Sequence, residues 1–291
     1  MIKKAVIPAA GAGTRLLPVT KAQPKEMLPI LDMPTIQYVV QEAVEAGAKD
    51  ILIVTGRNKR AIEDHFDRNL ELEDHLERRG DTDALNAIRH IADLARIHYV
   101  RQPIQAGLGD AVLCARAFVG DEPFAVLNGD AVFDAPIPVT RQLVKAFEEH
   151  RLPVVAVEEV PPEKVHRFGI VACTPIGKRL ARISRLVEKP SAGEAPSNLA
   201  IAGRYILTPE IFGALDTIPP GKNDEVQLTD ALSELLKTVS VLAVTVDGHR
   251  YDIGNKLDYL ETILAFALKR KEYVEPLRKL AKSIAGIDQG L

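Results

Sequence analysis

A glycine-rich segment near the start of the chain, with basic residues close behind it, is the first candidate for chemistry. Positions 11–13 read Gly-Ala-Gly after a short apolar run, and Arg15, Lys21 and Lys25 follow soon after. Backbone N–H groups in such a turn can reach phosphate oxygens, because a glycine has no Cβ to block the approach. The segment therefore indicates a phosphate-binding loop, while a tight turn followed by solvated lysines remains an alternative on spacing alone.

Two common phosphate-binding motifs do not fit this segment. A dinucleotide loop, G-x-G-x-x-G, needs a third glycine for close contact between helix and strand, and this chain has Leu16 there. The next apolar run ends in Thr55-Gly56-Arg57, without the acid that binds ribose. A P-loop, G-x-x-x-x-G-K-[ST], does not occur in the sequence. The remaining hypothesis for a phosphate-binding loop is one that holds a nucleoside triphosphate, which donates its nucleotidyl group.

Asp130 is the second candidate, because it follows the apolar run Phe124–Leu127 directly after Asn128-Gly129. Ligands in α/β proteins bind at the carboxyl ends of parallel strands, and a carboxylate there suits Mg²⁺. The histidines show no metal-ligand spacing, and Cys114 and Cys173 are too far apart to form a metal-binding pair. These cysteines are interpreted as small buried hydrophobic residues.

Charge and hydropathy exclude several classes of protein. The formal net charge is −3, which argues against a broad nucleic-acid surface and requires a local basic cluster to hold an anionic ligand. No apolar run approaches the roughly 20 residues that span a membrane. The first apolar run ends at Pro8, too short for a signal peptide. We expect a cytoplasmic protein with no membrane or nucleic-acid partner.

The elements that would position these residues follow an alternating pattern. Lys4–Ala9 is a predicted strand, the apolar spacing over 36–44 predicts a helix that ends at Gly47, and Ile51–Thr55 is a second strand. This order implies a right-handed parallel crossover. Residues 58–95 are rich in alternating charge and are predicted to form a solvated helical excursion.

The remaining elements predict one α/β domain over residues 1–291, with a nucleotide-binding half over about 1–135 and a β-rich and C-terminal half over about 136–291. The fold class is a Rossmann-like, doubly wound mixed sheet with a β-rich elaboration and C-terminal helices. The expected strands are 97–100, 124–127, 154–157, 170–173, 181–187, 200–207 and 241–246, and the expected helices are 110–118, 139–150, 209–215, 226–237 and the stretch from 255 onward.

The glycine loop also resembles a known signature, that of the sugar-1-phosphate nucleotidyltransferases. It is carried by Gly11-Ala-Gly-Thr-Arg-Leu-Leu-Pro18 and Pro24-Lys25-Glu26-Met27-Leu28-Pro29. Further matching blocks run along most of the chain, and those at 196–205 and 252–256 are similar to the bacterial UTP–glucose-1-phosphate uridylyltransferase branch. The resemblance implies the fold of nucleotide-diphospho-sugar transferases. One departure is Asn128-Gly129-Asp130, where that branch usually has Leu-Pro-Asp, and it leaves the choice of base or sugar open.

The reaction that this resemblance implies is attack of a glucose 1-phosphate oxygen on the α-phosphorus of UTP, with Mg²⁺ as cofactor. The nucleophile is already an anion, so the site must supply in-line positioning and neutralise charge. The resemblance implies Arg15 for the departing β,γ-phosphates, Lys25 for the α-phosphate and Lys189 for the sugar phosphate, with Asp130 and Asp252 as metal ligands.

The same resemblance assigns residues to the two substrates. The nucleotide-binding residues are Ala10, Gly11, Gly13, Glu26, Gln102 and Gly107, and the sugar-binding residues are Gly169, Glu188, Lys189 and Gly203. The Gln102 amide can both donate to and accept from a uracil edge. Alternatives are a thymidylyl- or cytidylyltransferase acting on a hexose 1-phosphate, and a non-catalytic nucleotide-sugar-binding protein. The resemblance also implies a homodimer or homotetramer.

Overall fold

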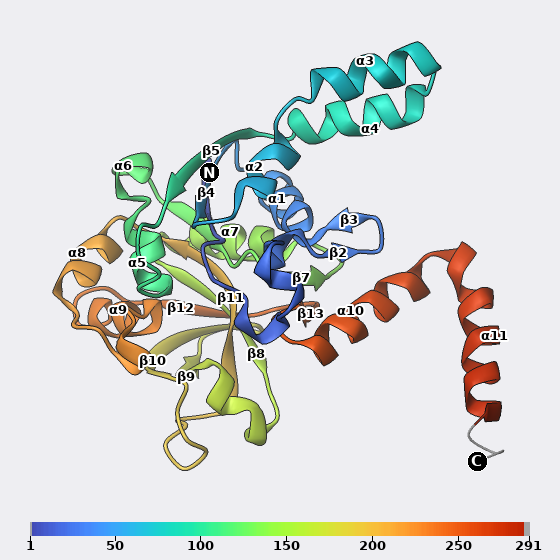
Figure 1. Ribbon diagram of the computed structural model, residues 1–291. Helices are drawn as coiled ribbons and strands as arrows, with labels where there is room; N and C mark the ends of the chain where they lie inside the picture. Colours follow the sequence, from blue (N-terminus) through green and yellow to red (C-terminus); the bar gives the residue numbers. More distant parts are fainter. Residues whose placement is uncertain (1, 288–291) are drawn as a thin grey trace.

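The computed structural model describes residues 2–287, and within that range the chain builds one large mixed sheet of nine strands with helices on both faces (Figure 1). This confirms the predicted fold class. In spatial order, the strands are β5 (Arg96–Arg101), β4 (Asp50–Thr55), β1 (Lys4–Pro8), β6 (Phe124–Leu127), β11 (Leu199–Leu207), β8 (Val154–Glu159), β12 (Leu242–Thr245), β10 (Leu180–Glu188) and β9 (Gly169–Pro175).

The two halves of the sequence meet in the middle of this sheet. Strands β5, β4, β1 and β6 are parallel, whereas β11 runs antiparallel to both β6 and β8. The parallel strands therefore end at one edge, where β1 leads into the glycine loop and β6 into Asp130. The sheet also folds back on itself, because β11 touches β9 through Ala200 and Ile170.

Two apolar cores lie on opposite faces of the sheet, because successive side chains of a strand point to opposite faces. Val6 of β1 belongs to the core that is shared with α5, α6, α8 and α9, while its neighbours Ala5 and Ile7 belong to the core with α1 and α7. These helices are α1 (Thr35–Glu45), α5 (Leu108–Leu113), α6 (Arg116–Val119), α7 (Val139–His150), α8 (Glu210–Thr217) and α9 (Leu228–Leu235).

Some expected elements have different bounds. The predicted helix over 110–118 is split into α5 and α6 near Cys114, and the predicted helix over 226–237 begins only at Leu228. Two short sheets did not appear in the sequence reading. They pair β13 (His249–Asp252) with β7 (Ala131–Asp134) and β2 (Pro29–Ile30) with β3 (Met33–Pro34). Such strands are too short for a period of two to stand out.

Two helical parts project from the sheet body (Figure 1). The charged excursion forms α2 (Arg60–Phe66) and the hairpin of α3 (Leu70–Arg79) and α4 (Thr82–Ala92), which confirms the prediction for 58–95. The chain closes with α10 (Lys256–Lys269) and α11 (Lys271–Ile287). Among the described residues, no helix is long and apolar enough to cross a membrane.

Candidate active site

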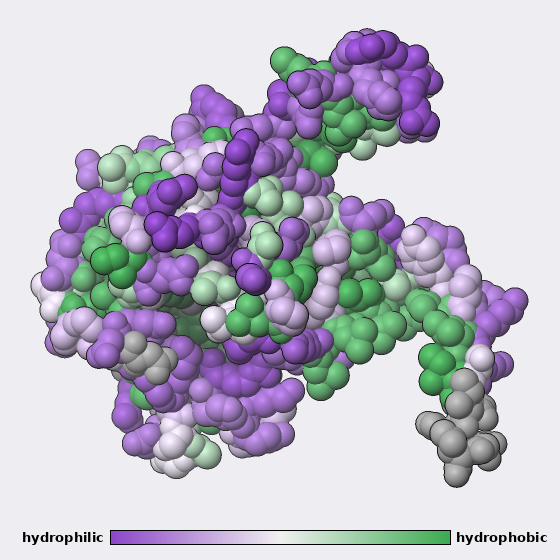
Figure 2. Space-filling view, in the orientation of Figure 1, coloured by the Kyte–Doolittle hydropathy of each residue, from purple (hydrophilic) through white to green (hydrophobic). Residues whose placement is uncertain are grey.

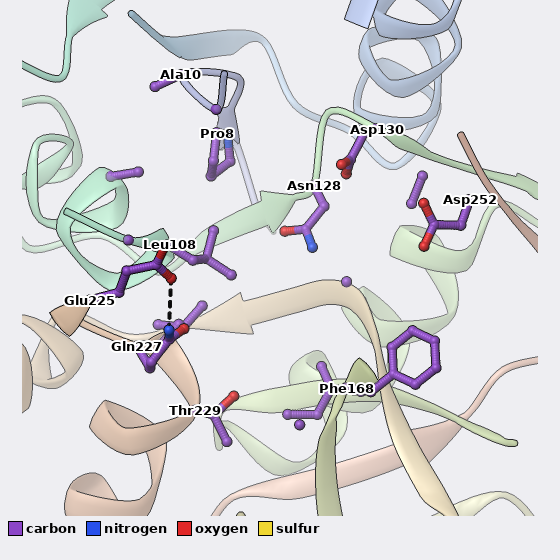
Figure 3. A pocket seen from close by; sticks show the side chains of 18 of the residues that line it. Pro8, Ala10, Leu108, Asn128, Asp130, Phe168, Glu225, Gln227, Thr229 and Asp252 are labelled. Atoms are coloured by element: carbon purple, nitrogen blue, oxygen red, sulfur yellow. Dashed lines mark hydrogen bonds between the residues drawn. The ribbon is translucent and has the colours of Figure 1, made fainter. Parts of the chain in front are cut away.

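One cleft of about 530 Å³ opens at the strand ends, where the two halves meet. All the site residues expected from the sequence line it, although they come from distant parts of the chain. Figure 3 shows several side chains of this cleft. The expected residues are Ala10, Gly11, Gly13, Arg15, Lys25, Glu26, Gln102, Gly107, Asp130, Gly169, Glu188, Lys189, Gly203 and Asp252.

The glycine loop lines this cleft. Side chains bind two of its carbonyls, since Gln105 donates to the Ala10 oxygen and Lys59 to the Gly11 oxygen, both at 2.7 Å. The N–H groups of residues 10–14 have no acceptor among the described residues. A Cβ on Gly11 would lie 3.7 Å from Nζ of Lys25, in the space beside that cation. Such an arrangement suits a phosphate group.

Lys25 is the first residue of a short 3₁₀ helix, Lys25–Met27. It pairs with Asp130, and its ammonium lies 2.5 Å from Oδ2 of that carboxylate. Burial alone would lower the pKa of Lys25, but the carboxylates of Asp130 and Glu26 together outweigh burial and raise it. Burial would raise the pKa of Asp130, but Lys25, a backbone hydrogen bond and the charge of Arg15 together outweigh burial and lower it. Both groups are therefore charged at neutral pH. A ligand can separate them, since the cation suits a phosphate and the carboxylate suits a metal ion.

Asp252 is the second of the two candidate metal-binding carboxylates in the cleft. The register of β13 on β7 places it opposite Ala131, directly after Asp130 in the chain. Burial and then the charge of Asp130 raise the pKa of Asp252. Two carboxylates with phosphate oxygens and water make an ordinary Mg²⁺ site. Among the described residues no larger group of His, Cys, Asp and Glu could hold a metal, so the other ligands would come from substrate and water.

Three arginines line the cleft near these carboxylates. Arg15 is exposed, and its guanidinium lies beside Gly254, where a Cβ would come within 3.1 Å. The sequence did not identify Arg167 and Arg250 as site residues. Each is 3.8 Å from Oδ2 of Asp252, and each packs over the Phe168 ring. The site thus has more positive charge than the glycine loop alone supplies.

Gln102, next to the end of β5, is buried and held in one orientation. Its Nε2 donates to Oδ2 of Asp110 at 2.6 Å and to the Gly107 oxygen at 3.1 Å. A carboxylate can only accept, so the nitrogen must face Asp110. The expected double role of this amide is therefore wrong in one respect. Both amide hydrogens are used within the protein, and Oε1 alone can serve a ligand.

On the opposite side of the cleft, Glu188 at the end of β10 pairs in register with Gly169 at the start of β9. One carboxylate oxygen of Glu188 accepts from Oγ1 of Thr229 at 2.7 Å, and the other lies 3.1 Å from Nζ of Lys189. A Cβ at position 169 would come within 2.7 Å of the Thr229 hydroxyl. Gly169 therefore lets the two strands and α9 close around Glu188. Thr229 was not identified from the sequence.

A buried ion pair lies beneath the Asp130 turn. Arg204 is fully buried in β11 and pairs with Glu42 of α1 at 2.8 Å. The same guanidinium donates to the carbonyls of Asn128 and Ala131, on either side of Asp130. The neighbouring Gly203 has a φ of 77°, at an irregularity in the pairing of β11 with β8. Such a bulge turns Arg204 into the interior.

Two buried cations near the cleft, Arg204 and Lys59, were not predicted, and only one of them has a recognisable pattern in the sequence. Arg204 interrupts the otherwise apolar strand Leu199–Leu207, and a charge inside a buried strand needs a partner. Its partner Glu42 could not be found by spacing, because it lies far away in the sequence. Lys59 had no such signal, although it is buried and pairs with Glu26 at 2.7 Å.

The nucleotidyl transferase family model matches residues 4–268, a range that includes all the residues that line the cleft. The chain belongs to this family. The match confirms the family expected from the glycine-loop signature. The nucleotidyltransferase assignment also agrees with the cleft, which presents cations, free backbone donors and two carboxylates.

Three relatives narrow the comparison within the family. The UTP–glucose-1-phosphate uridylyltransferase of Staphylococcus haemolyticus is 52% identical, over 97% of this chain and 98% of the relative. A crystal structure of UDP-glucose pyrophosphorylase complexed with UDP-glucose has a TM-score of 0.86 at 44% identity, covering 93% of this nucleotidyltransferase and 100% of that chain. A UTP-bound UGPase from Acinetobacter baumannii has a TM-score of 0.89 at 40% identity, covering 97% and 99%.

Proposed function

We propose that this nucleotidyltransferase joins UTP and glucose 1-phosphate to give UDP-glucose and pyrophosphate. The observation that carries the proposal is that one cleft has a glycine loop with free N–H groups on one side and the Glu188–Gly169 pair on the other. Support comes from the near full-length similarity to uridylyltransferases and from the relative complexed with UDP-glucose.

Gln102 supports a uracil or thymine base over cytosine. Its amide hydrogens are bound to Asp110 and Gly107, so its free Oε1 can only accept. Uracil and thymine carry an N3–H donor, whereas cytosine has an acceptor at N3 and donates only through its exocyclic N4 amino group. A base whose N3 faces Oε1 is therefore favoured when it is uracil or thymine, because cytosine would set two acceptors against each other there. Glu26 and the Ala10, Gly11, Gly13 and Gly107 backbone remain the proposed nucleotide contacts around it.

The proposed roles of the charged residues follow from their places in the cleft. Lys25 and the glycine-loop N–H groups hold the α-phosphate and stabilise the charge that develops there. Arg15 neutralises the β,γ-phosphates as they leave, and Lys189 orients the attacking sugar phosphate. Asp130 and Asp252 would hold Mg²⁺, which supplies positive charge shared between phosphate oxygens.

Glu188 is the proposed anchor for the sugar. Thr229 and Lys189 bind its two carboxylate oxygens from different sides, so the carboxylate has a fixed orientation. A carboxylate held in this way can accept hydrogen bonds from sugar hydroxyl groups. Gly169 and Gly203 stay the other proposed sugar-side residues, because a Cβ would come within 3.1 Å of Glu188 at position 169 and within 2.8 Å of Asn128 at position 203.

Pyrophosphate release tests the proposal. The purified chain is incubated with Mg²⁺, one of UTP, dTTP, CTP or ATP, and either glucose 1-phosphate or another hexose 1-phosphate. We expect the highest kcat/KM for UTP with glucose 1-phosphate, and the lowest pyrimidine rate for CTP. A preference for dTTP would support the thymidylyl alternative, and UTP binding without turnover would support a non-catalytic role.

The oligomeric state and location belong to the same proposal. Large apolar side chains are exposed along α10 and α11, among them Leu260, Leu264, Leu268 and Leu280. Figure 2 shows apolar residues gathered at these helices. We propose that they contact a second copy in a homodimer or homotetramer, which sedimentation of the full chain would reveal. A single functional domain and a cytoplasmic location stay predictions of the sequence.

A further inference from the structure

We propose that Asn128 is an additional sugar-binding residue of this enzyme, whose side-chain amide donates a hydrogen bond to a hydroxyl group of the hexose. The inference rests on the proposed function, because it assigns the residue to the sugar half of the same cleft. It concerns the position where this chain departs from the usual Leu-Pro-Asp of the uridylyltransferase branch.

The first observation is the unmet hydrogen-bonding capacity of this side chain. Oδ1 of Asn128 is buried without a partner among the described residues, a state shared only with the hydroxyl of Tyr99. Nδ2 likewise donates to no described residue, yet it is not among the buried unpaired atoms. A buried acceptor without a partner is unfavourable. Asparagine therefore costs stability at this position, and the atom left available to a ligand in the cleft is Nδ2.

The second observation is the direction of the side chain. Figure 3 shows Asn128 extending from the end of β6 into the cleft, on the same strand end as Asp130. Nδ2 lies toward Gly203, since a Cβ built on that glycine would come within 2.8 Å of it. The left-handed φ of 77° and the missing Cβ at Gly203 together make room for the amide beside the cleft.

The third observation is the position of Asn128 among the strands, which favours the hexose over the ribose. Its backbone N–H donates to the Gly203 oxygen at 3.0 Å, and its side-chain Nδ2 lies beside the same glycine, so Asn128 packs against β11. Next to β11 at this end comes β9, where a Cβ on Gly169 would meet Ile201 at 3.0 Å and Glu188 at 3.1 Å. The proposed base and ribose contacts come instead from β5, α5 and the glycine loop.

The backbone of Asn128 cannot move away to relieve the unpaired amide. Its carbonyl accepts from Arg204 at 3.2 Å, and the same guanidinium holds the turn through Ala131. The next residue, Gly129, donates its N–H to the Pro8 oxygen at 3.3 Å. The backbone that carries the amide is thus held in place before any substrate binds, which lowers the entropic cost of using it.

Equilibrium binding of nucleotide ligands tests the proposal without relying on turnover. Isothermal titration with UDP and with UDP-glucose gives the gain in affinity that the glucose provides. We expect Asn128→Leu to reduce this gain roughly 5- to 15-fold, the value of one hydrogen bond, while Kd for UDP stays the same. Asn86→Leu, the same change on the exposed surface of α4, should alter neither quantity.

Analogues of UDP-glucose that each lack one ring hydroxyl identify the acceptor. The wild-type protein should lose affinity for one analogue by a similar factor, and Asn128→Leu should lose nothing further with that analogue. The unliganded Asn128→Leu protein should have a Tm no lower than the wild type, because an unpaired buried oxygen is removed. Asn128→Ala repeats the measurement should leucine disturb the fold.

Three results would overturn the proposal. The first is that the gain in affinity from UDP to UDP-glucose is the same in Asn128→Leu as in the wild type. The second is that Asn128→Leu lowers the affinity for every deoxy analogue by the same further factor. The third is that Asn128→Leu weakens binding of UDP itself, which would assign the amide to the ribose or the phosphates. A wild-type protein that binds UDP-glucose no better than UDP would overturn the proposed function as well. The two failures are thus distinguishable.

Discussion

Two ion pairs meet at the Asp130 turn, and they differ in what surrounds them. Lys25 and Asp130 lie in the cleft, where the ammonium has one carboxylate partner and the loop beside it has free N–H groups. Arg204 and Glu42 lie beneath the turn, where Arg204 is fully buried. The guanidinium there also binds three backbone carbonyls, and Glu42 accepts from the Thr140 hydroxyl at 2.6 Å.

The comparison distinguishes an ion pair that can bind a ligand from an ion pair that holds the Asp130 turn in place. A pair whose remaining hydrogen-bonding capacity faces a cleft can exchange its partner for a ligand. A pair that is saturated by the backbone cannot, and breaking it leaves an uncompensated buried charge. We therefore expect changes in the cleft pair to alter turnover with little effect on folding, and changes in the buried pair to alter both.

Lys25→Ala should have the largest effect. It removes the cation proposed to stabilise the α-phosphate, and kcat for pyrophosphate release should fall roughly 100- to 1,000-fold. The far-ultraviolet circular dichroism and Tm should remain close to wild type. Lys21→Ala is the matched control, since Lys21 is exposed in the same segment and does not line the cleft. Near-normal turnover in Lys25→Ala would remove this residue from its role.

Asp130→Asn should lower kcat roughly 100-fold and raise the Mg²⁺ concentration needed for half-maximal rate, because one of two candidate carboxylate ligands loses its charge. The measurement is a Mg²⁺ titration of the initial rate. Asp134→Asn changes an exposed carboxylate that pairs with Lys269, and its titration should match the wild type. An unchanged Mg²⁺ requirement in Asp130→Asn would contradict the proposed metal site.

Arg204→Met should reduce kcat by a smaller factor, roughly tenfold, through misplacement of the turn that carries Asp130. It should also lower the free energy of unfolding by about 3–5 kcal/mol, because Glu42 is left buried and unpaired. Chemical denaturation measures this loss. Arg179→Met is the control, since it breaks an exposed pair with Asp247 that contributes about 0–1 kcal/mol.

Combining Arg204→Met with Glu42→Gln sharpens this prediction. The double variant should recover part of the stability, because neither charge is left buried, but it should not recover kcat. Recovery of both would mean that Arg204 contributes to folding alone. Loss of stability without any loss of kcat would equally contradict a positioning role.

The smallest effect concerns pH. Burial would raise the pKa of Glu42, but Arg204 and the hydrogen bonds from Thr140 together outweigh burial and hold that pKa below its ordinary value of 4.5. A carboxyl group whose pKa is lowered in the folded state stabilises the protein above its unfolded pKa, and this contribution is lost as pH falls below about 4.5. Glu42→Gln should flatten that part of the stability profile from denaturant titrations. An unchanged slope would contradict the assignment.

The sequence predicted most of the cleft because its residues stand at strand ends, where turns and motifs are legible. Gly11, Lys25 and Asp130 each follow a strand or a conspicuous loop, and the family signature placed Glu188 and Lys189. The support could not be predicted in the same way. Glu42 and Arg204 meet only after the sheet has assembled, and β7 and β13, which pair with each other, lie far apart in the sequence.

The hydrogen-bond partners of polar side chains in the cleft also could not be predicted from the sequence. Gln102 was expected to donate and accept, but Asp110 takes its donor capacity once α5 packs beside β5. Asn128 was read only as a departure from a motif, and its unmet hydrogen-bonding capacity depends on the bulge at Gly203. Both cases depend on which neighbour satisfies a polar group, which spacing alone does not specify.

A crystal structure of this protein with UTP and Mg²⁺ tests the contrast between the two pairs most directly. We predict that Lys25 separates from Asp130, so that the ammonium contacts the α-phosphate and the carboxylate contacts the metal ion, while Arg204 and Glu42 keep their 2.8 Å contact. If Lys25 stays 2.5 Å from Asp130 with the metal ion bound elsewhere, the account of the cleft pair is wrong.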